Sequence, residues 1–155
     1  MTKNCEIVRI EDRKTIKLVR DIIDLYHKQG GHIGGGASSI QLYYAYMCRD
    51  PDSYTDQKYI TAVAWLNESK PFRWIAEQYQ IPLDRSLFIR RITKTCPGPY
   101  LIDFLVDLQE KLKNDGLEVL WTLGFPDHSN ATYRKSGFKE IGRTQRSGYP
   151  IYVSY

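Results

Sequence analysis

Residues 128–142, HSNATYRKSGFKEIG, are the stretch that decides the fold. They bring a histidine, hydroxyl groups, an asparagine, a tyrosine and a basic pair into one short segment that runs directly into Gly137 and Phe138. Residues 129–136 have the composition of a short helix, and residues 138–144 continue as a strand. The stretch is therefore a helix–strand junction, and its polar side chains raise the question of whether it also belongs to an active site.

The rest of the chain alternates between strand and helix patterns. Residues 40–48 and 58–66 are rich in aromatic and β-branched side chains on either side of a turn-rich segment, which predicts an antiparallel pair. Residues 100–114 predict a helix with one apolar stripe, formed by Leu101, Phe104, Leu105, Leu108 and Leu112. Further strands are predicted at residues 5–10, 85–92, 117–123 and 149–155, and further helices at residues 16–26 and 70–80. The glycine-rich segment 30–38 is predicted to be a loop that lines a ligand or merely connects two elements.

Length and composition limit the class of protein. A chain of 155 residues with 42% hydrophobic residues predicts one domain, residues 1–155. The charged amino-terminal segment and the short apolar runs predict a cytoplasmic protein without a membrane span. Cys5, Cys48 and Cys96 are odd in number and form no CxxC pair, so we expect buried or idle thiols and no disulfide framework or cysteine zinc site. The net charge of +4 favours an anionic partner such as a nucleotide cofactor or nucleic acid.

The order of these elements, together with the segment NATYRKSGFKEIGR, resembles the GNAT superfamily of N-acetyltransferases. The resemblance covers most of the chain and implies an α/β (α+β) fold with a mixed, largely antiparallel central sheet flanked by helices. The family's Asn…Tyr-x-x-x-Gly-Phe segment corresponds here to Asn130, Tyr133, Gly137 and Phe138. The resemblance implies an acyl-CoA-dependent N-acyltransferase that acts on a small-molecule or macromolecular amine.

By the same resemblance, Tyr133 is the general acid that protonates the departing thiolate of coenzyme A. A phenol suits this role because its ordinary pKa of roughly 10 keeps it protonated at neutral pH. The alternative is a half-buried tyrosine without a chemical role. The base is less evident from the sequence, and Asp127 or a chain of water molecules is the candidate.

A cofactor site of this family also needs a cradle for the pyrophosphate of acetyl-CoA or another acyl-CoA. Helix amino termini suit a phosphate because their N–H groups are unpaired. The family's loop reads Gln/Arg-x-x-Gly-x-Gly/Ala, whereas residues 93–99 here read TKTCPGP, with two prolines that lack an N–H. The alternative is a plain Pro-Gly-Pro turn at the start of a helix. The resemblance implies the cofactor-binding residues Ile92, Thr93, Lys94, Thr95, Gly98 and Asn130.

The same carboxyl-terminal stretch also resembles the Mom-like DNA-modification proteins of bacteriophages, which are thought to share the GNAT scaffold. His128, Tyr133 and Phe138 match the spacing of that family's His-x-Gly-x-x-Tyr-x-x-x-x-Trp/Phe segment, with Asp127 adjacent. Arg91 in FIRRI takes the arginine position of its Leu-x-Arg-Leu strand. This resemblance implies Asp127, Tyr133 and Arg91 as catalytic residues and adenine in DNA as the substrate. A GNAT-like binding module without catalysis is a third hypothesis.

Two further sets of side chains bear on metal binding and on nucleic-acid binding. His27, His32 and His128 lack the paired spacing of metal ligands, so no metal is expected. Strand alternation predicts that Arg90 and Arg91 point in opposite directions. Ten basic residues are predicted to gather at one edge, where they either bind a nucleotide or nucleic-acid backbone or form a solvated surface. These are Arg73, Arg85, Arg90, Arg91, Lys94, Arg134, Lys135, Lys139, Arg143 and Arg146.

Overall fold

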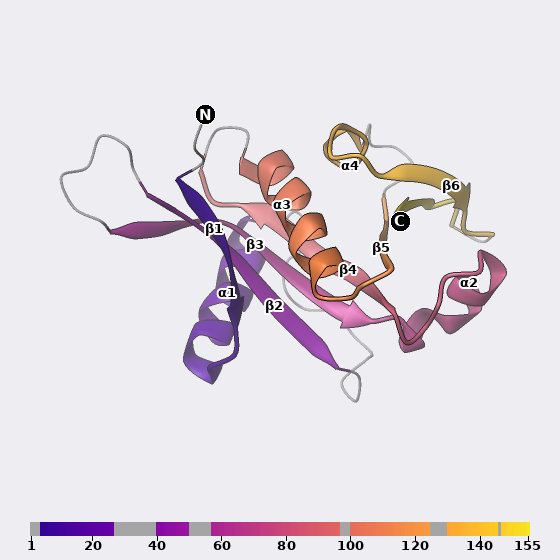
Figure 1. The fold of residues 1–155 in the computed structure, drawn as a ribbon, viewed down its shortest axis with the longest axis horizontal. Helices are drawn as coiled ribbons and strands as arrows, with labels where there is room; N and C mark the ends of the chain where they lie inside the picture. Colours follow the sequence, from indigo (N-terminus) through magenta and orange to yellow (C-terminus); the bar gives the residue numbers. More distant parts are fainter. Residues whose placement is uncertain (1–3, 27–39, 50–56, 97–99, 125–129, 146) are drawn as a thin grey trace.

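The computed structural model describes residues 4–26, 40–49, 57–96, 100–124, 130–145 and 147–155. These residues form a seven-stranded sheet with the strand order β1-β2-β3-β4-β5-β7-β6. Neighbouring strands are antiparallel except for β4 and β5, which are parallel. Helices lie on both faces of the sheet (Figure 1). The predicted fold class, a mixed and largely antiparallel central sheet flanked by helices, is confirmed.

The amino-terminal part of the sheet contains β1 (Cys5–Ile10), β2 (Gln41–Arg49), β3 (Lys58–Glu68) and β4 (Ser86–Lys94). The predicted antiparallel pair is confirmed by the ladder between β2 and β3. Both strands are apolar on both faces because each face is covered: Tyr44 and Tyr46 belong to the core under one set of helices, whereas Tyr43 and Trp65 belong to the core under the other.

The carboxyl-terminal part of the sheet contains β5 (Val119–Leu123), β6 (Lys139–Arg143) and β7 (Pro150–Ser154). β7 lies between β5 and β6 and is antiparallel to both, so the last strand of the chain completes the interior of the sheet. Trp121 of β5 is fully buried, and its indole N–H donates a hydrogen bond of 2.9 Å to the Ser69 hydroxyl. The strands predicted in this region are confirmed.

The helices divide between the two faces of the sheet. α1 (Arg13–Tyr26) packs on the amino-terminal part, and the 3-10 turn η1 (Lys70–Phe72) with α2 (Arg73–Gln78) packs on the same face of the carboxyl-terminal part. α3 (Tyr100–Asn114) and α4 (Ala131–Lys135) cover the opposite face. Among the described helices, none combines the length and the apolar character needed to cross a membrane.

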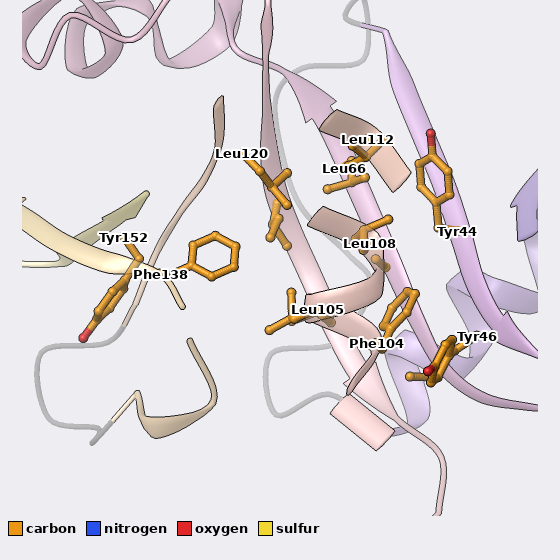
Figure 2. Packing of buried hydrophobic residues seen from close by; sticks show 14 of the residues in the cluster. Tyr44, Tyr46, Leu66, Phe104, Leu105, Leu108, Leu112, Leu120, Phe138 and Tyr152 are labelled. Atoms are coloured by element: carbon orange, nitrogen blue, oxygen red, sulfur yellow. The ribbon is translucent and has the colours of Figure 1, made fainter. Parts of the chain in front are cut away.

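The helix α3 joins the two parts of the sheet through one core. It has the predicted bounds, and four of its five predicted stripe residues are buried while Leu101 packs at the margin. Figure 2 shows this stripe between side chains of the amino-terminal part and side chains of the carboxyl-terminal part. The labelled partners are Tyr44, Tyr46 and Leu66 on one side and Leu120, Phe138 and Tyr152 on the other.

The expectation that all three cysteines are idle thiols is wrong for two of them. Cys5 and Cys48 form a disulfide, whereas Cys96 is free. The two bonded residues lie directly opposite each other in the β1–β2 ladder, with 4.0 Å between their Cα atoms. They are 43 residues apart in the chain, so their proximity depends on the strand register and leaves no signal in the cysteine spacing.

Candidate active site at the divergence of β4 and β5

The candidate site lies where β4 and β5 cease to pair. Their parallel ladder covers only Ser86–Phe88 of β4 and Val119–Trp121 of β5, after which β4 continues to Lys94 paired with β3 alone. A β-bulge in β4 also shifts its register with β3, because Arg90 is an extra residue between the pairs Trp65–Arg91 and Leu66–Ile89, and the bulge bends β4. Among the described residues, the backbone of β4 beyond Phe88 therefore has no strand partner on its β5 side.

Tyr133 reaches this divergence from α4. Its ring stacks on Tyr152 with 5.6 Å between centroids and meets Phe138 edge-on at 5.7 Å. Its phenol is hydrogen-bonded to the Thr122 side chain on β5, and the Thr122 hydroxyl donates 2.9 Å to the Ile89 carbonyl on β4. The phenol is thus held between the two strands by packing on its ring and by a polar bridge at its hydroxyl.

The environment of Tyr133 keeps its phenol protonated. Burial raises the pKa of Tyr133 above its ordinary value, while Thr122 and Arg91 act in the opposite direction and Tyr152 adds to the increase. A raised pKa means that the hydroxyl carries its proton throughout the neutral range. The arrangement suits a proton donor, because the proton is retained until negative charge develops nearby.

Arg91 is the cationic group of the site. One guanidinium N–H donates 2.6 Å to the Arg90 carbonyl, and the Nε atom is buried without a hydrogen-bond partner in the described part of the chain. Burial lowers the pKa of Arg91, with Arg90 acting in the same direction and Tyr133 against it. The group still carries its charge at neutral pH because an arginine pKa lies above roughly 12. A buried N–H without a partner is costly, so the site favours an acceptor atom from a ligand.

Arg90 and Arg91 have different surroundings. Arg90 is 8% exposed, lies 5.3 Å from the centroid of the Trp65 ring, and donates 3.1 Å to the Asn67 side-chain carbonyl. It therefore packs in the interior on the α1 face, whereas Arg91 interacts electrostatically with Tyr133. The expectation that these two adjacent arginines point in opposite directions stays a prediction, and Arg91 enters the candidate site through its electrostatic interaction with Tyr133.

Backbone N–H groups of β4 are the other polar atoms at the divergence. The Thr95 N–H donates 3.0 Å to the Thr61 carbonyl on β3, and its hydroxyl donates 2.7 Å to the Ile60 carbonyl. Backbone groups of a strand alternate between its two neighbours, so the N–H groups of Ile92 and Lys94 face away from β3, on the β5 side. Of the predicted cofactor-binding residues, Ile92 and Lys94 thus have N–H groups on this side, whereas both donors of Thr95 serve β3. The hydroxyl of Thr93 points to the Lys94 carbonyl.

Asn130 positions the start of α4. It has a left-handed backbone with a φ of 52°, and its carbonyl accepts from the Tyr133 N–H at 3.2 Å. Its side chain lies against Gly124, where an added Cβ would come within 2.6 Å of the amide oxygen. Sequence analysis singled out neither Gly124 nor Thr122, because a glycine after a strand and a threonine within one carry no distinguishing signal.

Several predicted residues fall outside the described part of the chain. These are Asp127, Gly98, His27, His32, His128 and Arg146. Within the described ranges, no group of histidine, cysteine and acidic side chains is placed to hold a metal ion. The predicted basic edge is interrupted, because Arg90 is buried and three other members already pair with acidic side chains. These pairs are Arg73 with Glu77, Arg85 with Glu118 and Arg143 with Glu140.

Comparison with known proteins gives one relative in sequence and many in structure. No protein-family model matches the chain. Over 155 residues it is 54% identical to uncharacterized protein 154 of Sulfolobus islandicus rod-shaped virus 1. The alignment covers all of this chain and 98% of that protein. At this identity over the full length, the two proteins belong to one family.

The structural matches include N-acetyltransferases of low sequence identity. The aminoglycoside acetyltransferase AAC(6')-Ib, solved with paromomycin and acetyl-CoA, aligns at a TM-score of 0.66 and 14% identity over 97% of this chain and 92% of that chain. The ribosomal-protein-S18-alanine N-acetyltransferase of Escherichia coli aligns at a TM-score of 0.57 and 14% identity, over 96% of this chain and 90% of that chain. The spermidine N-acetyltransferase of Vibrio cholerae, solved with CoA and spermine, aligns at a TM-score of 0.61 and 9% identity, over 97% of this chain and 93% of that chain. The chain therefore has the GNAT fold.

Proposed function

Since this chain belongs to the family of protein 154 of Sulfolobus islandicus rod-shaped virus 1 and has the GNAT fold, we propose that it is an acyl-CoA-dependent N-acyltransferase acting on an amine. The observation that carries this proposal is the protonated phenol of Tyr133, held by Thr122 at the divergence of β4 and β5. The second support is Arg91, whose buried Nε has no acceptor among the described residues. Together they form a site with a proton donor and a cation at the same opening of the sheet.

The residues at the divergence fit an acyl-CoA. The N–H groups of Ile92 and Lys94 on the β5 side of β4 suit the carbonyl groups of an extended chain that lies along the strand. The exposed Lys94 and the amino terminus of α3 suit a phosphate, and Gly98 is proposed as a further phosphate contact. Neighbours of the same fold include proteins solved with acetyl-CoA and with coenzyme A. Thr95 is left out of the proposed contacts because both of its donors serve β3.

The proposed reaction forms a bond between the amine nitrogen and the acyl carbon and breaks the bond between that carbon and sulfur. Coenzyme A, when bound, supplies the acyl group as a thioester. Tyr133 donates its phenolic proton to the departing sulfur, and Thr122 keeps the hydroxyl aimed into the divergence. The Ile92 N–H and the Arg91 guanidinium stabilise the negative charge that develops on the carbonyl oxygen and sulfur. The attacking amine loses one proton, for which Asp127 or a water molecule is the proposed acceptor.

The Mom-like hypothesis has less support at this site. Its Asp127 and His128 lie outside the described residues, and four members of the expected basic edge are buried or paired with acidic groups. A protein that follows a DNA backbone needs cations that are not neutralised in this way. The hypothesis of a binding module without catalysis is distinguished by the same experiment as the proposed function.

The test of the proposed function combines binding with turnover. Calorimetric titration with acetyl-CoA and with coenzyme A is expected to show saturable binding, and Tyr133→Phe is expected to bind acetyl-CoA as the wild type does. Turnover of Tyr133→Phe should fall by about a hundredfold, because a general acid contributes at least that much. Tyr59→Phe, at an exposed position of β3, is the matched control and should keep full turnover. Absence of heat at about 1 mM of either ligand would overturn the proposal.

A further inference from the structure

A cavity lies on the opposite face of the sheet from Tyr133. It has a volume of about 620 Å³ and is formed between the η1–α2 segment and the turn that connects β6 to β7. That size is within the range of pockets that enclose small organic ligands. The lining residues are Pro71, Phe72, Trp74, Ile75, Leu123, Thr144, Gln145, Ser147 and Tyr149.

The floor of this cavity is preformed. Phe72 packs on Phe88 with 4.1 Å between ring centroids and meets Trp121 edge-on at 6.3 Å. Ile75 is 2% exposed and belongs to the same core as these two aromatic residues. A floor anchored in the core keeps its shape when a ligand binds, so little ordering opposes binding.

The walls of the cavity carry two partly exposed aromatic side chains. Trp74 is 58% exposed on α2, and Tyr149 is 37% exposed at the start of β7. The turn that carries Tyr149 is closed by the Thr144 N–H donating 2.9 Å to the Tyr149 carbonyl and by the Tyr149 N–H donating 3.0 Å to the Thr144 hydroxyl. Large aromatic surfaces held by ordered elements beside a cavity favour a ligand that covers them.

The cavity adjoins the proposed active site through β5. Thr122 and Leu123 are consecutive residues of this strand, so their side chains point to opposite faces. Thr122 contacts Tyr133 and Ile89 on one face, and Leu123 lines the cavity on the other. A ligand in the cavity and an acyl donor along β4 would therefore approach the end of β5 from the two sides of the sheet.

The charges around the cavity select against a polycation. None of its described lining residues is acidic, and its polar groups are the neutral side chains of Thr144, Gln145 and Ser147. Lys70 lies within the η1 segment and adds positive charge nearby, whereas the charge of Arg73 on α2 is paired with Glu77. Aromatic faces attract a single ammonium group, but several positive charges need carboxylates as partners.

We propose that this cavity binds the acceptor, and that the acceptor is a primary amine with one positive charge and an aromatic or branched apolar group. The acceptor role rests on the proposed N-acyltransferase function, whereas the binding of this ligand class does not. The proposal separates this chain from neighbours of the same fold that were solved with paromomycin or spermine, both of which carry several amino groups.

The experiment measures binding without any acyl-CoA and then measures turnover. The probes are 2-phenylethylamine, its alcohol analogue 2-phenylethanol, and spermidine, each titrated calorimetrically into the full chain. We expect 2-phenylethylamine to bind most tightly and spermidine not to bind. Trp74→Ala should weaken the binding of 2-phenylethylamine by about tenfold, since loss of a large aromatic contact has this effect. Tyr59→Ala removes an exposed aromatic residue of β3 far along the chain and is expected to leave binding unchanged.

The outcomes separate the two proposals. Tighter binding of spermidine than of 2-phenylethylamine, or equal affinities in Trp74→Ala and the wild type, would overturn the inference about the cavity. If spermidine is acylated and 2-phenylethylamine is not, the enzymatic proposal stands and the acceptor class is wrong. If 2-phenylethylamine binds at Trp74 but no acyl-CoA supports turnover, the cavity's ligand class stands and the enzymatic function fails.

Discussion

The amino-terminal and carboxyl-terminal parts of the sheet are each well paired internally, but they are joined to each other by a short ladder. β2 pairs with β3 over its whole length, Gln41–Arg49, whereas β4 pairs with β5 only over Ser86–Phe88. Where strands pair fully, their backbone groups are satisfied by each other and cannot bind a ligand. The difference explains why the candidate site lies at the join. The fold positions polar groups there, but these groups do not take part in a strand ladder between β4 and β5.

The weak join is compensated by the core on one face. α3 packs against Tyr44 and Leu66 of the amino-terminal part and against Leu120 and Phe138 of the carboxyl-terminal part (Figure 2). Apolar burial is not directional, so it holds two strands at a fixed separation without requiring hydrogen bonds between them. The opening between β4 and β5 can therefore be rigid, as a site for positioned chemistry requires.

The disulfide provides the largest test of this comparison. Removing it in the double variant Cys5→Ser, Cys48→Ser should lower the free energy of unfolding by about 4 kcal/mol, because the bond closes a long loop in the unfolded chain. The bond lies in the amino-terminal part, away from Tyr133, so turnover of the folded variant at 25 °C should equal that of the wild type. Denaturant unfolding and steady-state kinetics measure the two quantities.

Cys96→Ser is the control for that variant, since Cys96 is free and its loss should leave stability within about 0.5 kcal/mol of the wild type. Treating the wild type with a thiol reductant should reproduce the destabilisation without any substitution. An unchanged unfolding midpoint in reductant would mean that the β1–β2 ladder does not depend on this bond. A large loss of turnover would mean that the two parts are coupled more tightly than the short ladder indicates.

The secondary structure was predictable because burial leaves a local pattern. The stripe of α3 and the aromatic, β-branched runs of β2 and β3 occur within single elements, so the chain alone reveals them. The Cys5–Cys48 bond depends on the register between two strands, which a local pattern does not contain. Element identity was thus predictable, whereas contacts between distant elements were not.

The candidate site divides in the same way. Tyr133 and Arg91 were predicted from the motifs of two families that the chain resembles, and their roles in the candidate site stay predictions. Thr122 joins the candidate site only through its contact with Tyr133, which forms when α4 packs over β5. The sequence of its own strand therefore does not distinguish it. Thr95 is a residue type that often binds phosphate, but its position directly after β4 directs its N–H and its hydroxyl to carbonyl groups of β3. Motifs therefore predicted which residue types belong to the site, whereas the position of each residue in its strand decided which of its donor atoms face the site.

The second test changes the carboxyl-terminal part next to the site. In Gly124→Ala, the new Cβ would lie 2.6 Å from the Asn130 amide oxygen and 2.9 Å from a ring carbon of Tyr152. Since Tyr152 stacks on Tyr133 and Asn130 precedes α4, relief of these clashes must move the proton donor. We expect a loss of about 1–3 kcal/mol in the free energy of unfolding and a fall in kcat of about tenfold or more.

Gly142→Ala is the matched control for Gly124→Ala. Its Cβ would lie 2.3 Å from the Tyr79 hydroxyl and 2.6 Å from the adjoining ring carbon, so the steric conflict is comparable. Gly142 belongs to the same part of the sheet, and the nearest atoms that its Cβ would meet all belong to Tyr79, so this variant should lose stability while keeping its kcat. Equal effects of the two variants on kcat would indicate that Tyr133 is not specifically positioned by Gly124.

The smallest test concerns alkaline pH and the amino-terminal part. Burial, followed by the 2.5 Å hydrogen bond to Asp107, raises the pKa of Tyr46, and burial also raises the pKa values of Tyr43 and Tyr44. The unfolded chain loses these protons near pH 10, roughly the ordinary tyrosine value, whereas the folded chain retains them to higher pH. The stabilisation is therefore complete below about pH 10 and is lost as the pH rises towards the folded pKa values.

Denaturant midpoints measured from pH 8 to 11 should fall in the wild type and fall less steeply in Tyr46→Phe, with Tyr59→Phe declining as the wild type does. An equally steep decline in Tyr46→Phe would assign the alkaline sensitivity to other groups, such as Tyr133 in the carboxyl-terminal part, whose pKa is also raised by burial.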